Sequence, residues 1–299
     1  MGEAIGRTDE CIAVDWGTTN RRAYRMDRSG SCTAGFEDAQ GILSIAAGGF
    51  PAAVSEIRQR LGNKPLLMAG MIGSNRGWVE APYVPCPAGL DELVKRLVWA
   101  GRAEVIVPGM CYIGDGRADV MRGEEVQLLG AVAAGLVPQN CLVCHPGTHN
   151  KWAIVAAGKI TSFRTVMTGE LFNLLRAHSI LSDLLQGDVE PNDAFRCGVR
   201  RALDYHDAQA ELFTVRARVL LGQGRKEDAG SYASGLLIGS DVRIGLAGNA
   251  ADRVLVMGRP ELTELYSAAL REAGVDCAEL DGERCFLAGI QEIAERIFR

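Results

Sequence analysis

Two short segments of the sequence place hydroxyl, amide and acidic side chains around a glycine that ends an apolar run. The first supplies Asp15, Gly17, Thr18, Thr19 and Asn20, and the second supplies Gly147, Thr148, His149 and Lys151. Glycine lets a backbone approach an anion closely, and successive turn amides with threonine hydroxyls can bind phosphoryl oxygens. We interpret both segments as phosphate-binding turns. Asp15 adds a carboxylate suited to holding Mg²⁺ through water, because this ion keeps much of its hydration shell.

The two turns belong to an internal repeat. Residues 11–23 (CIAVDWGTTNRRA) and 141–153 (CLVCHPGTHNKWA) align at an offset of 130 with five identical positions. Each window is an apolar run that bends at a glycine-threonine pair and continues extended, which is typical of a β-hairpin. One such turn alone is explained as well by a plain hairpin whose threonine and asparagine stabilise the bend. Its repetition favours two related halves whose turns bind one phosphate-bearing ligand.

Apolar runs and helical periodicity alternate along the chain, which predicts an α/β fold. Glycines at 109, 114 and 116 indicate a domain boundary near 110–125, and we expect domains at 1–120 and 121–299. The expected strands are 11–15, 21–26, 65–72, 104–108, a run from 141, 152–156, 160–166, 253–257 and 276–280. The expected helices are 51–61, 89–100, 123–135, 170–186, 192–204, 207–222, 227–245, 261–273 and 285–298.

The composition is that of an ordinary soluble globular protein. The 299 residues are 47% hydrophobic and 23% charged, which is enough for two cores. The net charge of −5 argues against a nucleic-acid-binding face, and the longest apolar run (128–137) is shorter than the roughly 20 residues of a membrane span. The polar first ten residues lack the apolar region of a secretion signal. We expect a cytoplasmic protein without nucleic-acid or membrane partners; homo-oligomerisation is left open.

The nine cysteines raise one alternative for the second turn. Cys141, Cys144 and His145 have the spacing of a c-type haem attachment site, and His149 would extend them to a metal cluster. In a strand, however, Cys141 and Cys144 point to opposite faces, which makes shared metal ligation difficult. We therefore interpret this segment as a buried strand.

Longer motifs throughout the chain resemble the 2-dehydro-3-deoxygalactonokinase family, within the actin-like ATPase superfamily of sugar kinases. The matching stretches are VDWGTTNRRAY (14–24), AGMIGSNRGWVEAPYVPCPAG (69–89), VMRGEEVQLLGA (120–131), HPGTHNKW (145–152), FRTVMTGELFNLLRAHSIL (163–181) and SGLLIGSDV (234–242). The resemblance implies two ribonuclease-H-like domains flanking a nucleotide cleft, with the sugar-acid site on the first and the nucleotide site on the second. It also implies ATP and Mg²⁺ as cofactors.

The activity that the resemblance implies is transfer of a phosphoryl group from ATP to the 6-hydroxyl of 2-dehydro-3-deoxy-D-galactonate, in galactonate breakdown. This acid differs from its gluconate epimer only in the configuration of one hydroxyl group. The alternative activity is therefore that of a kinase for another keto-deoxy sugar acid, such as 2-dehydro-3-deoxygluconate. Two other classes stay open on the same fold. A sugar-responsive regulator would carry an added DNA-binding segment, and a polyphosphate or nucleotide hydrolase would turn over without sugar.

Phosphoryl transfer needs positioning, charge stabilisation and a carboxylate that accepts the proton of the attacking hydroxyl. Glu124 is our candidate base, because the GEEVQLLG stretch at 123–130 is typical of a helix start. In the sugar kinases that the chain resembles, the base carboxylate lies similarly at the start of an inter-domain helix. A helix N-terminus also favours the ionised carboxylate. Glu125 and Asp119 are alternative bases, and the two glutamates could equally serve only to complement the helix dipole.

The polar loop after the expected strand at 65–72 is the candidate sugar-acid site, since α/β folds place ligands at strand ends. Arg76 could bind the substrate carboxylate through two hydrogen bonds. Trp78 could form an apolar wall or belong to the core, and Arg22 is a rival anion-binding group. The candidate substrate-binding residues are Ser74, Asn75, Arg76, Trp78, Glu80 and Arg164.

Adenosine contacts are predicted at Gly239 and at Gly258, which follows the apolar run 253–257. The superfamily that the chain resembles holds adenosine at such positions, and a glycine between a strand and a helix is also a routine turn. The sequence has no GxxxxGK[ST] loop, which excludes a P-loop kinase.

Overall fold

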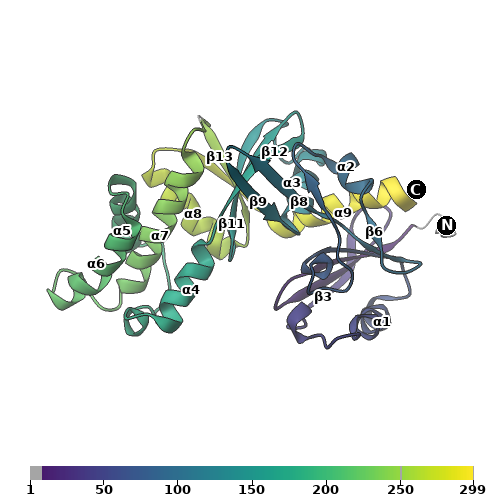
Figure 1. The fold of residues 1–299 in the computed structure, drawn as a ribbon, viewed down its shortest axis with the longest axis horizontal. Coiled ribbons are helices and arrows are strands. Elements are labelled where there is room, and N and C mark those ends of the chain that lie inside the picture. Colours follow the sequence, from purple (N-terminus) through teal and green to yellow (C-terminus); the bar gives the residue numbers. More distant parts are fainter. Residues whose placement is uncertain (1–8, 250, 299) are drawn as a thin grey trace. The chain divides into compact units, whose positions relative to one another are not determined.

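The computed structural model describes residues 9–249 and 251–298, which form two compact units (Figure 1). Among the described residues, the first unit takes in 9–140, the segment Val155–Ser162 and the C-terminal segment 283–298. The second unit consists of Cys141–Ile154 and Phe163–Gly282. Residues 1–8 of the polar N-terminal segment, which is expected to lack a secretion signal, lie outside the described residues. No helix within the described ranges has the length and apolar character needed to cross a bilayer.

The first unit contains a six-stranded sheet in the order β3-β2-β1-β4-β7-β6. Strands β1 and β2 are antiparallel, as are β2 and β3, whereas β1, β4 and β7 are parallel. The strands are β1 (Cys11–Trp16), β2 (Arg21–Met26), β3 (Cys32–Asp38), β4 (Leu66–Gly70), β6 (Val98–Trp99) and β7 (Glu104–Ile106). The short helices η1 (Ile42–Ser44) and η2 (Met71–Gly73) follow β3 and β4.

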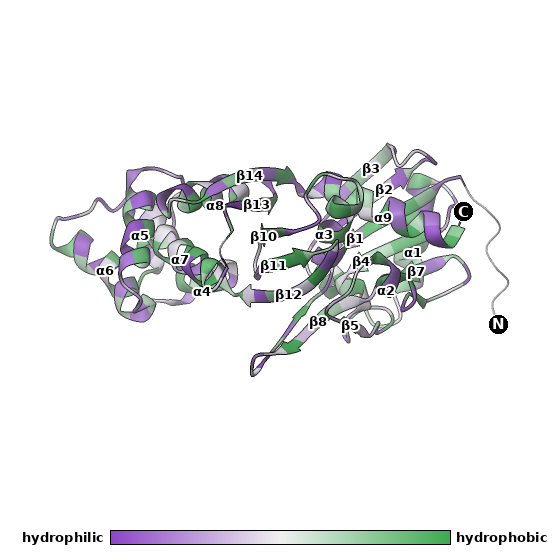
Figure 2. Cartoon of the chain, turned by 90° about the horizontal axis from the view of Figure 1, so that it is seen from above, coloured by the Kyte–Doolittle hydropathy of each residue, from purple (hydrophilic) through white to green (hydrophobic). Residues whose placement is uncertain are grey.

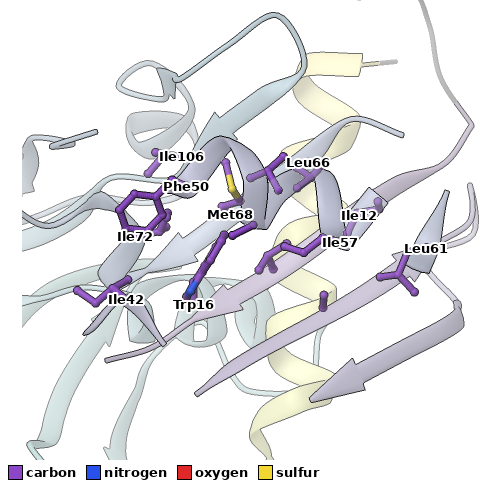
Figure 3. Close-up of a cluster of buried hydrophobic side chains, with 14 of the residues drawn as sticks. Ile12, Trp16, Ile42, Phe50, Ile57, Leu61, Leu66, Met68, Ile72 and Ile106 are labelled. Carbon is purple, nitrogen blue, oxygen red and sulfur yellow. The ribbon is translucent and has the colours of Figure 1, made fainter. Parts of the chain in front are cut away.

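The core of this unit forms where alternate residues of β1 meet helix α1 (Phe50–Leu61). Ile12 and Trp16 point to this face and pack with Phe50 and Ile57 (Figure 3). Helix α9 (Gly282–Phe298) runs behind the same strands, where the Tyr24 hydroxyl donates to the Glu283 carboxylate at 2.8 Å. The last helix therefore packs on the first unit, a placement that local sequence patterns did not determine.

A three-stranded sheet and two helices complete the first unit. The sheet has the order β5-β8-β9, from β5 (Tyr83–Pro85), β8 (Gly109–Gly114) and β9 (Arg117–Met121), and the helices are α2 (Leu90–Val94) and α3 (Glu124–Ala133). These strands and β3 were not predicted. The expected helix at 89–100 was wrong beyond Val94, because residues 98 and 99 pair with β7 as strand β6.

The second unit repeats the sheet order of the first. Its order β12-β11-β10-β13-β14 matches β3-β2-β1-β4-β7, and β10, β13 and β14 are parallel. Strand β10 begins at Cys141, 130 residues after β1 begins at Cys11, which confirms the predicted repeat and the α/β class with two related halves. The strands are β10 (Cys141–His145), β11 (Asn150–Ala156), β12 (Lys159–Val166), β13 (Arg253–Gly258) and β14 (Asp276–Asp281).

Helices cover the sheet of the second unit, and strands β10 and β11 are hydrophobic over much of their length (Figure 2). Leu142 and Cys144 pack with Trp152 and with apolar side chains of the surrounding helices. The buried Cys144 thiol donates to Asn150 Oδ1, so this cysteine is part of the core of the strand. The helices are α4 (Thr168–His178), η3 (Ser182–Leu184), α5 (Asp193–Asp204), α6 (Ala208–Leu220), α7 (Ala229–Leu246) and α8 (Pro260–Glu272).

Candidate active site

The first predicted turn lies between β1 and β2, and its carbonyl groups face inward. The amide of Ile42 donates to Gly17 O at 3.0 Å, and the amide of Gly41 donates to Thr19 O at 2.9 Å. In a trans peptide the carbonyl and the following N–H point in opposite directions, so the N–H groups after these carbonyls face away from η1. Thr18, Thr19 and Asn20 are exposed on that outer side. The turn therefore presents amide and hydroxyl donors outward, as an anion site requires.

Gly41 supports this turn, and sequence reasoning missed it. A Cβ at position 41 would lie 2.3 Å from Thr18 O and 2.3 Å from the Thr19 carbonyl carbon. These are backbone atoms of the turn itself, so they cannot move away without changing the turn. The sequence signal was a lone glycine before an apolar residue, and nothing local connects it to residues 18–19.

Replacing Gly41 by alanine is expected to destabilise the protein by about 1–3 kcal/mol, the usual cost of overpacking. It is also expected to raise the KM for ATP about tenfold, which is roughly 1.4 kcal/mol of binding energy, because the displaced turn presents its amides poorly. Urea unfolding and steady-state kinetics measure the two effects. Normal stability and a normal KM would show that the contact between Gly41 and the turn has no role.

The second predicted turn lies between β10 and β11 and rests on the start of α4. The Glu170 amide donates to Thr148 O at 3.0 Å, and a Cβ on Gly169 would lie 2.6 Å from Gly147 O. The Glu170 carboxylate also pairs with His149 Nε2. Lys151 is only 4% exposed, and its Nζ donates to His149 O at 2.9 Å. Lys151 thus braces the turn from within the protein.

Gly147 differs from Gly41 in that no heavy atom lies within 4 Å of the position of a Cβ. A methyl group at 147 should fit the fold while occupying the space through which a phosphate would approach the backbone. Gly147→Ala is therefore expected to keep the thermal midpoint within 2 °C or so, since ΔΔG should be well under 1 kcal/mol. The affinity for Mg-ATP, measured by calorimetry, is expected to fall about tenfold (roughly 1.4 kcal/mol).

Gly187→Ala is the matched control for Gly147→Ala, because its Cβ would meet only Glu227 O, at 3.6 Å, outside the predicted site. Equal ATP affinity for both variants would contradict phosphate binding at the second turn.

Two carboxylates approach the carboxyl ends of β1 and β4. Asp15 is a β1 residue whose side chain is 19% exposed and pairs with Arg22 at 3.3 Å. Gly70 ends β4 with a φ of +90°, and its Cβ would lie 3.5 Å from Asp15 Oδ1. A Cβ on Gly123 would in turn lie 3.2 Å from Gly70 Cα. These glycines let the start of α3, with Glu124, lie against the strand ends that carry Asp15.

Glu124 and Glu125 have different environments at the start of α3. Glu124 is partly exposed, and its Oε2 accepts a hydrogen bond from the Arg122 amide at 3.0 Å. Glu125 is completely buried, and its two oxygens accept the Gly123 amide at 2.9 and 2.7 Å. Burial, and next the charge of Glu124, raise the pKa of Glu125 to about 8. Glu125 is therefore mostly protonated at neutral pH, and Glu124 is the more accessible of the two carboxyl groups.

The third candidate base, Asp119, lies in β9 opposite Tyr112. Its Oδ1 accepts the amide of Val120 at 2.9 Å, and its Oδ2 is 3.9 Å from Arg117. These partners all belong to the β8–β9 hairpin, so Asp119 has a structural explanation.

The loop from η2 to β5 is closed by backbone hydrogen bonds and presents three polar side chains. Trp78 N donates to Ile72 O, and the Trp78 ring stacks on Phe50 with centroids 6.5 Å apart, which places it against the core. Ser74 is buried, and its hydroxyl oxygen accepts a hydrogen bond from the Arg76 amide at 3.3 Å. The exposed members of the predicted substrate set in this loop are Asn75, Arg76 and Glu80.

Arg122 connects this loop to the start of α3, and sequence reasoning missed it. Its Nη2 donates to Ala81 O at 2.8 Å, and its guanidinium lies 4.4 Å from the ring centroid of Tyr83. Its Nε and Nη1 atoms are buried without a hydrogen-bond partner. The only local signal was its position two residues before Glu124 in the GEE motif.

The remaining predicted residues lie in the second unit. Gly239 lies where α7 crosses α5, and a Cβ there would be 2.8 Å from Val199 O, so close helix packing already accounts for this glycine. Gly258 ends β13 beside Pro146, the residue before the second turn. A Cβ added at position 258 would lie 3.6 Å from Pro146 O. Arg164 is exposed on β12. The structure thus brings Gly258 to the second turn, while the adenosine contacts stay predictions.

Comparisons with known proteins agree with this architecture. The family model described as 2-keto-3-deoxy-galactonokinase matches residues 15–293. The 2-dehydro-3-deoxygalactonokinase of Escherichia coli (strain K12) is 37% identical over 97% of this chain and 99% of its own length. A Rhizobium meliloti (strain 1021) protein provisionally given the same activity is 36% identical over 96% of this chain and 97% of its own length.

Solved structures show the same relationship. A Sinorhizobium meliloti protein, provisionally described as a 2-dehydro-3-deoxygalactonokinase, has a TM-score of 0.90 at 36% identity, over 96% of this chain and 99% of the other. Component A of the Acidaminococcus fermentans (R)-2-hydroxyglutaryl-CoA dehydratase shares only the fold, with a TM-score of 0.53 at 13% identity over 98% of this chain and all of its own. The chain belongs to the 2-keto-3-deoxy-galactonokinase family.

Proposed function

We propose that this protein is a kinase that transfers a phosphoryl group from ATP to the 6-hydroxyl of 2-dehydro-3-deoxy-D-galactonate, in galactonate breakdown. The observation that carries the proposal is the 37% identity to a kinase named for this acid, over nearly the full length of both chains. The arrangement of Asp15 and Glu124 at neighbouring strand and helix ends supports it, because phosphoryl transfer needs a metal-holding carboxylate and a base.

In the proposed mechanism, Glu124 accepts the proton of the attacking hydroxyl, which its partial exposure allows. Asn75, Arg76 and Glu80 bind the sugar acid, with the Arg76 guanidinium on its carboxylate. The outward amides of the first turn and those of the second turn hold phosphoryl oxygens. The sugar-acid site then lies on residues 1–120, and the nucleotide phosphates and adenosine are held mainly by residues 121–299.

The residues at the first turn fit Mg²⁺, because Asp15 is a partly exposed oxygen ligand beside outward-facing amides. Asp15 would hold the ion through water. When bound, Mg²⁺ supplies positive charge that neutralises the triphosphate. We also place the protein in the cytoplasm, because its nine scattered cysteines, an odd number, do not indicate a disulfide framework of the kind found in secreted proteins.

A coupled assay of ATP consumption over a panel of aldonic and 2-keto-3-deoxy acids tests this function. We expect turnover only with Mg²⁺ and with the galactonate-derived keto acid as the best substrate. Preference for the gluconate epimer would support the alternative substrate. ATP consumption without any acid would instead indicate a hydrolase, and ATP binding without phosphorylation of any keto-deoxy acid would remove the substrate proposal.

A further inference from the structure

A buried carboxylate on α7 connects the elements around the second turn. Asp241 is 0% exposed and accepts hydrogen bonds from four side chains. The Asn150 amide nitrogen lies 3.0 and 2.9 Å from its two oxygens, and Trp152 Nε1 lies 2.7 Å from Oδ1. The hydroxyls of Thr168 and Tyr266 also donate to Oδ2. Burial raises the pKa of the Asp241 carboxyl group, and the hydrogen bonds from these four side chains oppose that rise because they favour the charged form.

Two of these partners lie on the two sides of the predicted phosphate turn. Asn150 is the residue at which the chain leaves the turn and enters β11. Thr168 begins α4, directly before Gly169, whose backbone packs against Gly147 O. Asp241 thus holds both the end of the turn and the helix start on which the turn rests. The corresponding residue of the first turn, Asn20, is exposed, so this support is particular to the second half.

The two other partners fix the carboxylate itself. Trp152 packs against α7 at Gly245, where a Cβ would lie 2.0 Å from the indole ring. Tyr266 joins the network from α8 and is 2% exposed. A carboxylate held by strand β11 and helices α4 and α8 cannot turn to form other contacts. Networks of buried polar groups that are fully satisfied make their surroundings rigid.

We propose that Asp241 is a positioning residue for the nucleotide: it holds the Gly147–His149 turn and the start of α4 in the geometry that binds phosphate. This inference rests on the proposed function, because it takes the second turn as a nucleotide phosphate site. A positioning role for Asp241 and a purely structural role predict different experimental results. A structural residue changes the amount of folded enzyme, whereas a positioning residue changes nucleotide binding in enzyme that is folded.

The experiment compares Asp241→Asn with Glu211→Gln. Asparagine replaces one oxygen of Asp241 by an NH₂ group. The hydroxyls of Thr168 and Tyr266 can accept from that group, but the Asn150 amide nitrogen, which donates to both oxygens of Asp241, cannot, so the substitution weakens the contact that holds the end of the turn. Glu211 is a matched control, since it is also a buried carboxylate of the second unit, and it pairs with Arg201 at 2.6 and 2.9 Å between α6 and α5. Mg-ATP affinity is measured by calorimetry, folding by circular dichroism, and the two KM values by kinetics.

We expect Asp241→Asn to weaken Mg-ATP binding at least tenfold, with the KM for the keto acid within twofold of wild type. Glu211→Gln should lower the thermal midpoint and leave ATP affinity within twofold. Folded Asp241→Asn with normal ATP affinity, or with both KM values raised equally, would overturn the inference. If Asp241→Asn does not fold, Thr168→Val removes only the α4 link; weaker ATP binding then supports the inference and normal binding overturns it. Wild-type enzyme that binds no ATP would overturn the proposed function, and this inference with it.

Discussion

Glu124→Gln is expected to lower kcat by roughly 10²- to 10⁴-fold, the usual contribution of a positioned general base. Glutamine keeps the size and the hydrogen-bonding oxygen of the side chain, so the contact with the Arg122 amide can persist. It cannot accept the proton of the attacking hydroxyl. Binding of Mg-ATP should therefore be unchanged, because the loss concerns the transition state rather than the ground state. Steady-state kinetics and calorimetry on the purified variant give both values.

Glu125→Gln is the control for this prediction. Glu125 is buried next to Glu124, and burial raises its pKa to about 8, so at pH 7 the wild-type side chain is mostly the neutral acid. Glutamine resembles that neutral form and should lower kcat less than tenfold. Near-normal turnover in Glu124→Gln, or an equal loss in both variants, would rule out Glu124 as the base.

Asp15→Asn is expected to raise the Mg²⁺ concentration needed for half-maximal activity by about 10- to 100-fold. This is the usual loss of metal affinity, about 10- to 100-fold, when a residue that binds the ligands of a metal, rather than the metal itself, is replaced. The carboxylate oxygen of Asp15 is the proposed support for the hydrated ion, and an amide carries no charge to attract it. The measurement is a Mg²⁺ titration of activity at saturating ATP and keto acid. Added Mg²⁺ should restore most of the turnover.

Arg22 provides the control for Asp15, because the two side chains pair at 3.3 Å. If Asp15 acts by binding this arginine, Arg22→Gln should change the Mg²⁺ requirement as much as Asp15→Asn does. If Asp15 holds the ion, Arg22→Gln should leave that requirement unchanged or lower it, because a competing cation has been removed. A Mg²⁺ requirement in Asp15→Asn equal to that of wild type would contradict the proposed metal site.

The elements that local sequence determines were predictable. The repeat at 11–23 and 141–153 located the first residues of β1 and β10, because a glycine-threonine bend between extended runs is a local property. The expected helix at 89–100 failed for the opposite reason. Residues 98 and 99 form β6 only because β7 is there to pair with them, and no pattern within the segment encodes that partner.

The candidate site residues show the same difference between features that local sequence determines and features that depend on distant partners. The position of Glu124 at a helix start could be predicted, since the GEE motif is local. Whether Trp78 lines a site or belongs to the core depended on Phe50, which is distant in sequence. Gly41 and Arg122 were missed because their partners, Thr18 and Ala81, are brought to them only by the folded chain.

The central claim is that the turns at Gly17 and Gly147 bind the phosphates of one nucleotide. The most direct measurement is a crystal structure of the enzyme with Mg²⁺ and a non-hydrolysable ATP analogue. We expect phosphoryl oxygens about 2.7–3.2 Å from backbone nitrogens of both turns, with Asp15 joined to the metal through water. A triphosphate bound away from either turn would contradict the account.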